Sequence, residues 1–298
     1  MKSEDLDPPV ALTIAGTDSG GAAGVAADIE AFTAHGVFGA MVVTAVTAQD
    51  TTGVHAALSL PPELVGAQLD AVTGDLPVAA VKTGMLANLA IVEVVTKAAR
   101  AGRLPSLVVD PVMVASSGAR LLEGDAVAAY RELLRHALVT TPNLPEAAML
   151  LGREIKDLEA MVEAARELHA LGAGYVVVKG GHLPEALGAD PQVGTGPPDG
   201  ERGLEAVDAV FDGKSVTLLR SPWTETRNVH GSGCTLSAAI AARLARGENP
   251  LAAIAGAKQY VSGAIARSAA WTLGRGPGPL CRLPLPDHLS TPIDFGAP

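Results

Sequence analysis

The feature that most constrains this fold is an alternation of short apolar runs with segments of helical periodicity. Apolar runs of this kind predict strands buried on both faces, and strands separated by helices indicate a mostly parallel sheet between two helical layers. With 298 residues, 48% of them hydrophobic, the chain can fill such an α/β core. The expected strands are Val10–Ala15, Ala40–Val46, Ala79–Val81, Leu107–Val109, Ala137–Thr140 and Tyr175–Val178, and the expected helices run over about 25–35, 88–101, 125–135 and 157–171.

The rest of the chain fits the same single domain, which we expect to span residues 1–298. Two apolar runs flank Asp212-Gly213, which predicts a hairpin, and two Ala-rich helices follow over about 234–246 and 250–272. Three segments depart from the pattern and are expected at the surface: an N-terminal tail (1–9), a Gly- and Pro-rich insertion (184–203) and a Pro-rich C-terminal tail (274–298).

Charge and composition exclude several classes of function. The net charge of −10 argues against sequence-independent binding of nucleic acid, which needs a basic surface. The sequence has no pattern of a signal peptide or a membrane span, so no membrane partner is expected and a cytoplasmic location is predicted. Its two cysteines, Cys234 and Cys281, form no CxxC motif and suggest neither a zinc site nor a disulfide framework.

The segment from His230 to Thr235 carries the strongest chemical signal. Gly231 and Gly233 free successive backbone N–H groups to face one anion, and the helix that follows adds its positive N-terminal dipole. This arrangement suits the charge that develops during phosphoryl transfer. Cys234 stands in the first helical turn, where the dipole is expected to favour the thiolate.

Polar residues also follow several of the expected strands. Asp110 could contact Mg²⁺, or it could simply start a turn before a proline, while Lys179 could pair with ATP phosphates. Asn143 and Glu146 could lie near a metal and phosphate, although capping of the helix that begins there explains both equally well. The Gly-rich segment 16–24 could approach a ligand or form a tight connection.

Gln49 and Asp28 could together recognise an aminopyrimidine. Gln49 is expected to end the second strand, and its amide can both donate and accept a hydrogen bond, while a carboxylate accepts from an amino group. The competing interpretations are a turn-capping glutamine and a solvated helix carboxylate.

The motifs, taken in order, resemble one family, the hydroxymethylpyrimidine/phosphomethylpyrimidine kinases of thiamine biosynthesis. The similarity covers about residues 10–280. It rests on Ala11–Gly21, Thr44–Gln49, Lys82–Leu86, Asp110–Met113, Thr141–Ala147, Val178–His182, Ala206–Asp208, Phe211–Gly213, His230–Thr235 and Gly274–Pro279.

This resemblance implies a ribokinase-like three-layer α/β/α sandwich, a homodimer, ATP and Mg²⁺ as cofactors, and an aminopyrimidine alcohol and its phosphate as substrates. It also implies a role for each of fourteen residues. Substrate contacts would be Gly16, Asp28, Thr47, Gln49, Met85 and Val112; ATP contacts Asp110, Asn143, Lys179 and Thr226; metal contacts Asp110 and Glu146; and catalytic residues Cys234, Lys179, Gly231 and Gly233.

Two other functions remain open from the sequence. A pyridoxal kinase of the same fold would also phosphorylate a hydroxymethyl group on an aromatic nitrogen ring, but pyridoxal carries a phenol in place of the amine. A non-catalytic ligand-binding protein is the third interpretation, and Asp110, Lys179 and the Gly231–Gly233 loop argue against it.

Overall fold

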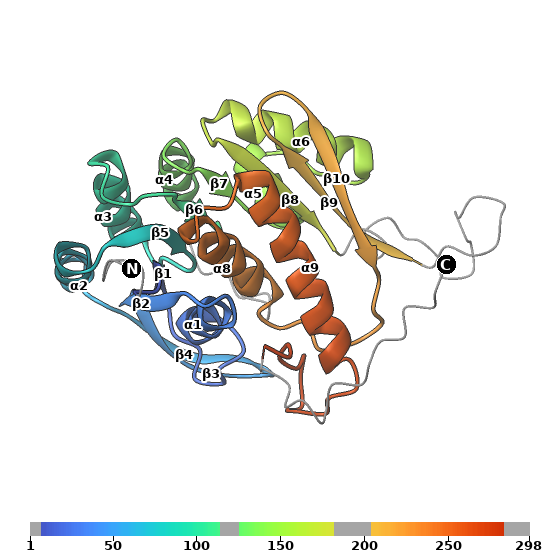
Figure 1. The fold of residues 1–298 in the computed structure, drawn as a ribbon, viewed down its shortest axis with the longest axis horizontal. Coiled ribbons are helices and arrows are strands. Elements are labelled where there is room, and N and C mark those ends of the chain that lie inside the picture. Colours follow the sequence, from blue (N-terminus) through green and yellow to red (C-terminus); the bar gives the residue numbers. More distant parts are fainter. Residues whose placement is uncertain (1–6, 114–124, 182–203, 283–298) are drawn as a thin grey trace.

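A mixed sheet forms the centre of the fold (Figure 1). The structure is a computed structural model that describes residues 7–113, 125–181 and 204–282. The strand order is β10-β9-β8-β7-β6-β5-β1-β2; β8, β9 and β10 pair antiparallel and all other neighbours pair parallel. The strands are β1 (Val10–Ala15), β2 (Phe38–Val43), β5 (Val78–Thr83), β6 (Val108–Val109), β7 (Val139–Thr140), β8 (Tyr175–Gly180), β9 (Glu205–Phe211) and β10 (Val216–Pro222).

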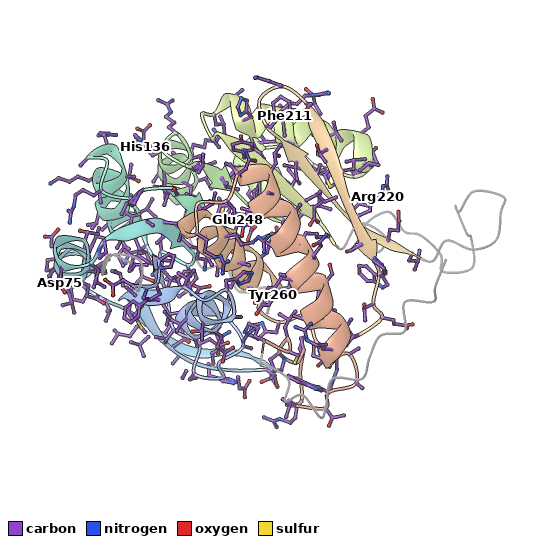
Figure 2. The ribbon with its side chains drawn as sticks, viewed as in Figure 1. Asp75, His136, Phe211, Arg220, Glu248 and Tyr260 are labelled. Carbon is purple, nitrogen blue, oxygen red and sulfur yellow. The ribbon has the colours of Figure 1, made fainter. Side chains whose placement is uncertain are left out.

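Helices cover both faces of this sheet, as the alternation predicted. On one face, the helices pack on strand residues such as Ala11 and Val108; on the other, they pack on alternate residues such as Leu12 and Val109. Side chains fill both layers (Figure 2), and Tyr260 meets the ring of His35 edge-on at 4.7 Å between centroids. The first layer holds α1 (Gly24–Ala34), α8 (Ser232–Ala245) and α9 (Pro250–Ser268), and the second α2 (Pro62–Asp75), α3 (Leu89–Arg100), α4 (Asp125–Leu134), α5 (Leu144–Leu151) and α6 (Leu158–Ala170).

The expected strand Ala40–Val46 is wrong in its extent, because the chain leaves the sheet at Thr44. The Thr44 hydroxyl donates to the carbonyl oxygen of Met85 at 2.6 Å, and β2 has already ended at Val43. A separate antiparallel hairpin follows, made of β3 (Ala45–Asp50) and β4 (Gly53–Ser59). Figure 1 shows this hairpin beside β2. Gln49 lies on β3 of the hairpin and does not end a strand of the central sheet.

The expected C-terminal surface tail also needs correction over its described part, residues 274–282. Leu280, Cys281 and Arg282 are only 3%, 1% and 6% exposed. The backbone N–H of His230 donates to the carbonyl oxygen of Gly278 at 3.1 Å, which ties this segment to the loop before α8. The expected insertion 184–203 and the N-terminal residues 1–6 lie outside the described residues. Among the described helices, none has the length and apolar character that crossing a bilayer requires.

Candidate active site

A cavity of about 650 Å³ opens where the parallel strands end. Its wall combines the loop after β1, the β3–β4 hairpin, the ends of β5, β6 and β8, and the start of α8. Ligands of open α/β sheets bind at the carboxyl ends of the strands. Thirteen of the fourteen residues named from the sequence line the cavity: Gly16, Thr47, Gln49, Met85, Asp110, Val112, Asn143, Glu146, Lys179, Thr226, Gly231, Gly233 and Cys234.

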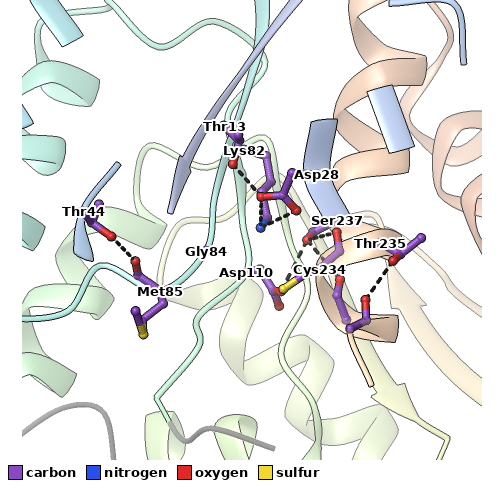
Figure 3. A network of polar contacts seen from close by, with 12 residues as sticks. Thr13, Asp28, Thr44, Lys82, Gly84, Met85, Asp110, Cys234, Thr235 and Ser237 are labelled. Atoms are coloured by element: carbon purple, nitrogen blue, oxygen red, sulfur yellow. Dashed lines mark hydrogen bonds and ion pairs between the residues drawn. The ribbon is translucent and has the colours of Figure 1, made fainter. Parts of the chain in front are cut away.

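Asp28 is the exception, and the expectation that it reads the substrate is wrong. Its side chain is fully buried, and the Lys82 ammonium donates to its two carboxylate oxygens at 3.0 and 2.8 Å (Figure 3). The Thr13 hydroxyl donates to one of them at 2.6 Å. Burial alone would lower the pKa of Lys82, but Asp28 outweighs it and the pKa is raised. Asp28 therefore neutralises a buried lysine beneath the site.

The loop before α8 is packed backbone against backbone. Gly231 has φ +83°, and a Cβ atom there would collide with the carbonyl oxygen of Ala22. A Cβ on Gly233 would lie 3.1 Å from Nζ of Lys179, so the start of α8 faces this ammonium closely. The loop thus places the N-terminus of α8 and the Lys179 ammonium beside the same part of the cavity. Both carry positive charge, so together they can bind an anion.

Cys234 does not have the thiolate character expected from its position in the first helical turn. Burial raises the pKa of the Cys234 thiol; Lys82 lowers it and the carboxylates of Asp28 and Asp110 raise it again. The backbone N–H of Gly24 also lowers it but does not reverse the shift. The resting side chain is therefore a thiol at neutral pH.

Two carboxylates flank Lys179 of β8: Asp110 directly follows β6, and Glu146 lies in the first turn of α5. Nζ of Lys179 lies 2.9 Å from Oδ1 of Asp110 and 3.9 Å from Oε2 of Glu146. Asp110 also accepts from the hydroxyl of Thr141 at 3.1 Å and from the hydroxyl of Ser237 at 3.3 Å (Figure 3). Burial would lower the pKa of Lys179, but the two carboxylates raise it, so the ammonium stays charged.

These carboxylates fit a Mg²⁺ ion that is completed by water and phosphate oxygens, because Mg²⁺ commonly takes only one or two protein carboxylates. Within the described residues there is no group of three or more His, Cys, Asp or Glu side chains that could hold a metal alone. Asn143 and Glu146 form the expected capping box at the start of α5, with both bonds at 2.8 Å. The capping interpretation is thus correct, and both residues line the cavity as well.

Glu146 should make the stability of the protein depend on pH. Burial raises its pKa from the ordinary 4.5 to about 7, although Lys179 opposes the shift. The folded state then holds the proton more tightly than the unfolded chain, so the free energy of unfolding should fall as pH rises from about 4.5 to about 7 and level off above. Urea unfolding of the wild type and Glu146→Gln across this range measures it. A difference between the two proteins that does not change with pH would contradict the assignment.

Two cavity residues were missed as functional residues by the sequence analysis, Asp18 and His230. The Asp18 carboxylate accepts from the backbone N–H groups of Gly20, Ala22 and Ala23 at 2.8, 3.1 and 2.8 Å. Burial would raise the pKa of Asp18, but His230 and the N–H groups of Gly20 and Ala23 lower it. An aspartate close before glycines is a local signal for a loop whose N–H groups face the carboxylate. The pairing of Asp18 with His230 has no local signal, because His230 comes 212 positions later in the sequence.

Known proteins share this fold and sequence. A family model described as phosphomethylpyrimidine kinase matches residues 18–281. The hydroxymethylpyrimidine/phosphomethylpyrimidine kinase of Rhizobium meliloti (strain 1021) is 48% identical over 91% of this chain and 96% of its own. Two solved structures are each 35% identical: a Bacillus subtilis pyridoxal kinase in complex with ADP (TM-score 0.78; 92% of this chain, 97% of its own) and a Clostridium difficile 630 phosphomethylpyrimidine kinase (TM-score 0.71; 86% and 99%).

Proposed function

The chain belongs to the phosphomethylpyrimidine kinase family, and on this premise we propose that it phosphorylates 4-amino-5-hydroxymethyl-2-methylpyrimidine and then the resulting monophosphate, with ATP as the donor. The observation that carries the proposal is the meeting of three features in one cavity: the Gly231–Gly233 loop, Lys179 and the amide of Gln49. The first two suit a phosphoryl group, and the third suits the edge of an aminopyrimidine.

In the first step, the hydroxymethyl oxygen attacks the γ-phosphorus, the bond to the β,γ-bridging oxygen breaks, and ADP leaves. Lys179 and the N–H groups at the start of α8 offset the charge that builds on the transferred group. Asp110 and Glu146 would hold Mg²⁺, which supplies further positive charge to the phosphates. Asn143 and Thr226 line the same cavity and would contact ATP. The ring would be enclosed by Gly16, Thr47, Met85 and Val112. Figure 3 shows the contact of Met85 with Thr44.

Cys234 should matter for the first step and little for the second. Its thiol lines the cavity, where it can orient the alcohol, and only its thiolate form could take up the proton, whereas the monophosphate already presents an ionised oxygen. Cys234→Ala should therefore lower kcat on the alcohol by about 10²-fold and change kcat on the monophosphate by less than about threefold. Steady-state ADP release with each substrate measures both. Equal losses on the two substrates would contradict this role.

A pyridoxal kinase is the second candidate, favoured by the Bacillus subtilis neighbour. The experiment that separates the two is ³¹P NMR of the enzyme with ATP, Mg²⁺ and the pyrimidine alcohol. The proposal predicts a monophosphate signal that later converts to a diphosphate. No phosphorylated pyrimidine, together with phosphorylation of pyridoxal in a parallel sample, would leave the pyridoxal kinase as the function.

We also propose a homodimer built on the β2 side of the fold. Large apolar side chains are exposed there, on the sheet edge, the hairpin and α2, and a second copy of the chain would cover them. Analytical ultracentrifugation tests this assembly. The exposed residues are Phe38 (52%), Met41 (45%), Val46 (49%), Leu58 (68%) and Leu64 (46%).

The cytoplasmic location stays a prediction.

A further inference from the structure

His230 lies between a carboxylate and the amide expected to read the substrate. Its Nε2 atom is 3.3 Å from Oδ2 of Asp18 and 3.2 Å from Nε2 of Gln49. His230 is 8% exposed and Asp18 6%, and all three side chains line the cavity. Three segments far apart in sequence thus meet here: the loop after β1, the β3–β4 hairpin and the loop before α8.

Asp18 decides which nitrogen of His230 carries hydrogen. Three backbone N–H groups point at the carboxylate, and His230 together with the N–H groups of Gly20 and Ala23 lowers its pKa, so Asp18 is ionised and can only accept. A bare Nε2 would place a lone pair against this negative charge. Nε2 of His230 therefore carries a hydrogen, which Asp18 and the Gln49 amide share.

Thr47 constrains the other end of the same amide. Its hydroxyl donates to the carbonyl oxygen of Thr17 at 2.7 Å, so its single hydrogen is already used. The second outer atom of the Gln49 amide lies 3.5 Å from this hydroxyl oxygen. Thr47 can therefore offer Gln49 only a lone pair, and it favours an N–H group on that side.

The oxygen and nitrogen of an amide are isosteric, so their partners determine which atom takes which place. The structure places Nε2 of Gln49 towards His230 and Oε1 of Gln49 towards Thr47. Both partners favour the exchanged amide, in which the Gln49 oxygen accepts from the N–H of His230 and the Gln49 nitrogen donates to Thr47. We propose that His230, held by Asp18, is a positioning residue that fixes the Gln49 amide in this orientation and so selects an aromatic ring with an amine next to a ring nitrogen. The inference rests on the proposed function, in which Gln49 contacts the ring.

The fixed amide presents an acceptor on the His230 side and a donor on the Thr47 side. A bound aminopyrimidine would then place its amine towards His230 and the adjacent ring nitrogen towards Thr47. Pyridoxal has an aldehyde in place of the amine and a hydroxyl-bearing carbon in place of the ring nitrogen beside it. Since an aldehyde oxygen cannot donate, the oxygen of the amide is left unpaired. An unpaired buried polar group is what makes such sites selective.

Two variants of His230 test the proposal, because glutamine can place an N–H group near the position of Nε2 and phenylalanine cannot. We expect His230→Phe to raise the dissociation constant of the pyrimidine alcohol by about 10- to 100-fold, and that of an analogue lacking the amine by less than about threefold. His230→Gln should restore most of the affinity for the alcohol. Calorimetric titration of the wild type and both variants measures these constants. Equal weakening for both ligands would mean a structural role and overturn the proposal.

A second measurement keeps the test valid if His230→Phe fails to fold. In ¹⁵N-histidine-labelled wild-type protein, the shifts of the His230 ring, assigned by their loss in His230→Gln, should show a protonated Nε2. A bare Nε2 would overturn the inference without any reference to activity. Absence of pyrimidine phosphorylation with a protonated Nε2 would instead contradict the proposed function and leave the hydrogen-bond assignment standing.

Discussion

Lys179→Ala should lower kcat by about 10³-fold on both pyrimidine substrates. The ammonium of Lys179 is the cation that lies 2.9 Å from Asp110 and 3.1 Å from where a Cβ of Gly233 would be. Removing it leaves Asp110 and Glu146 without their shared partner at the point where phosphate charge must be offset. Both steps transfer a phosphoryl group at this point, so both should suffer alike.

Lys156→Ala is the matched control, because Lys156 is 75% exposed and its ion pair among the described residues is with the equally exposed Glu154. Its kcat should stay within about twofold of the wild type. Initial rates of ADP formation at saturating substrate give the comparison, with circular dichroism to verify that each variant is folded. A folded Lys179→Ala enzyme with a kcat near that of the wild type would remove Lys179 from the catalytic machinery.

Gly231→Ala should have the second large effect, a loss of about 10²-fold or more in kcat/KM. Gly231 has φ +83°, which L side chains rarely adopt, and its added methyl group would collide with the carbonyl oxygen of Ala22. Relief of this collision must displace the start of α8 or the loop after β1. Either movement takes the N–H groups at the start of α8 out of line with Lys179.

Gly247→Ala separates this effect from backbone strain alone. Gly247 has φ +80°, almost the same conformation, but a Cβ there would meet nothing within 4 Å. It should cost about 1–2 kcal/mol of stability and leave kcat/KM unchanged. Thermal unfolding and initial rates on both variants measure the two effects. Similar activity losses in the two variants would attribute the effect to strain and not to the position of the loop.

The alternation of strands and helices was sufficient to predict the layers. Local sequence was enough to place Leu12 and Val109 on buried strands. It was also enough to place the glycines around Ser232 at the start of a helix. The boundary at Thr44 was not predictable in this way, because it depends on a bond from Thr44 to Met85, 41 residues away. The apolar run simply continues through the point where the chain leaves the sheet.

The errors in the site have a similar cause. Asp28 looks like a solvated or ligand-binding carboxylate until Lys82, 54 residues further on, is seen buried against it. For Cys234, the helix dipole can be read from the sequence, but the burial that raises the thiol pKa cannot. Likewise, the Pro-rich segment around Gly278 gives no local sign that it packs on the loop before α8.

The central claim is that this cavity selects an aminopyrimidine for phosphorylation. The most direct measurement is kcat/KM for the pyrimidine alcohol, its monophosphate and pyridoxal, determined in parallel with ATP and Mg²⁺. We predict turnover of both pyrimidines, with kcat/KM for the alcohol at least about 10-fold above that for pyridoxal. A higher kcat/KM for pyridoxal than for either pyrimidine would contradict the account, while leaving the phosphate site around Lys179 and Gly231 in place.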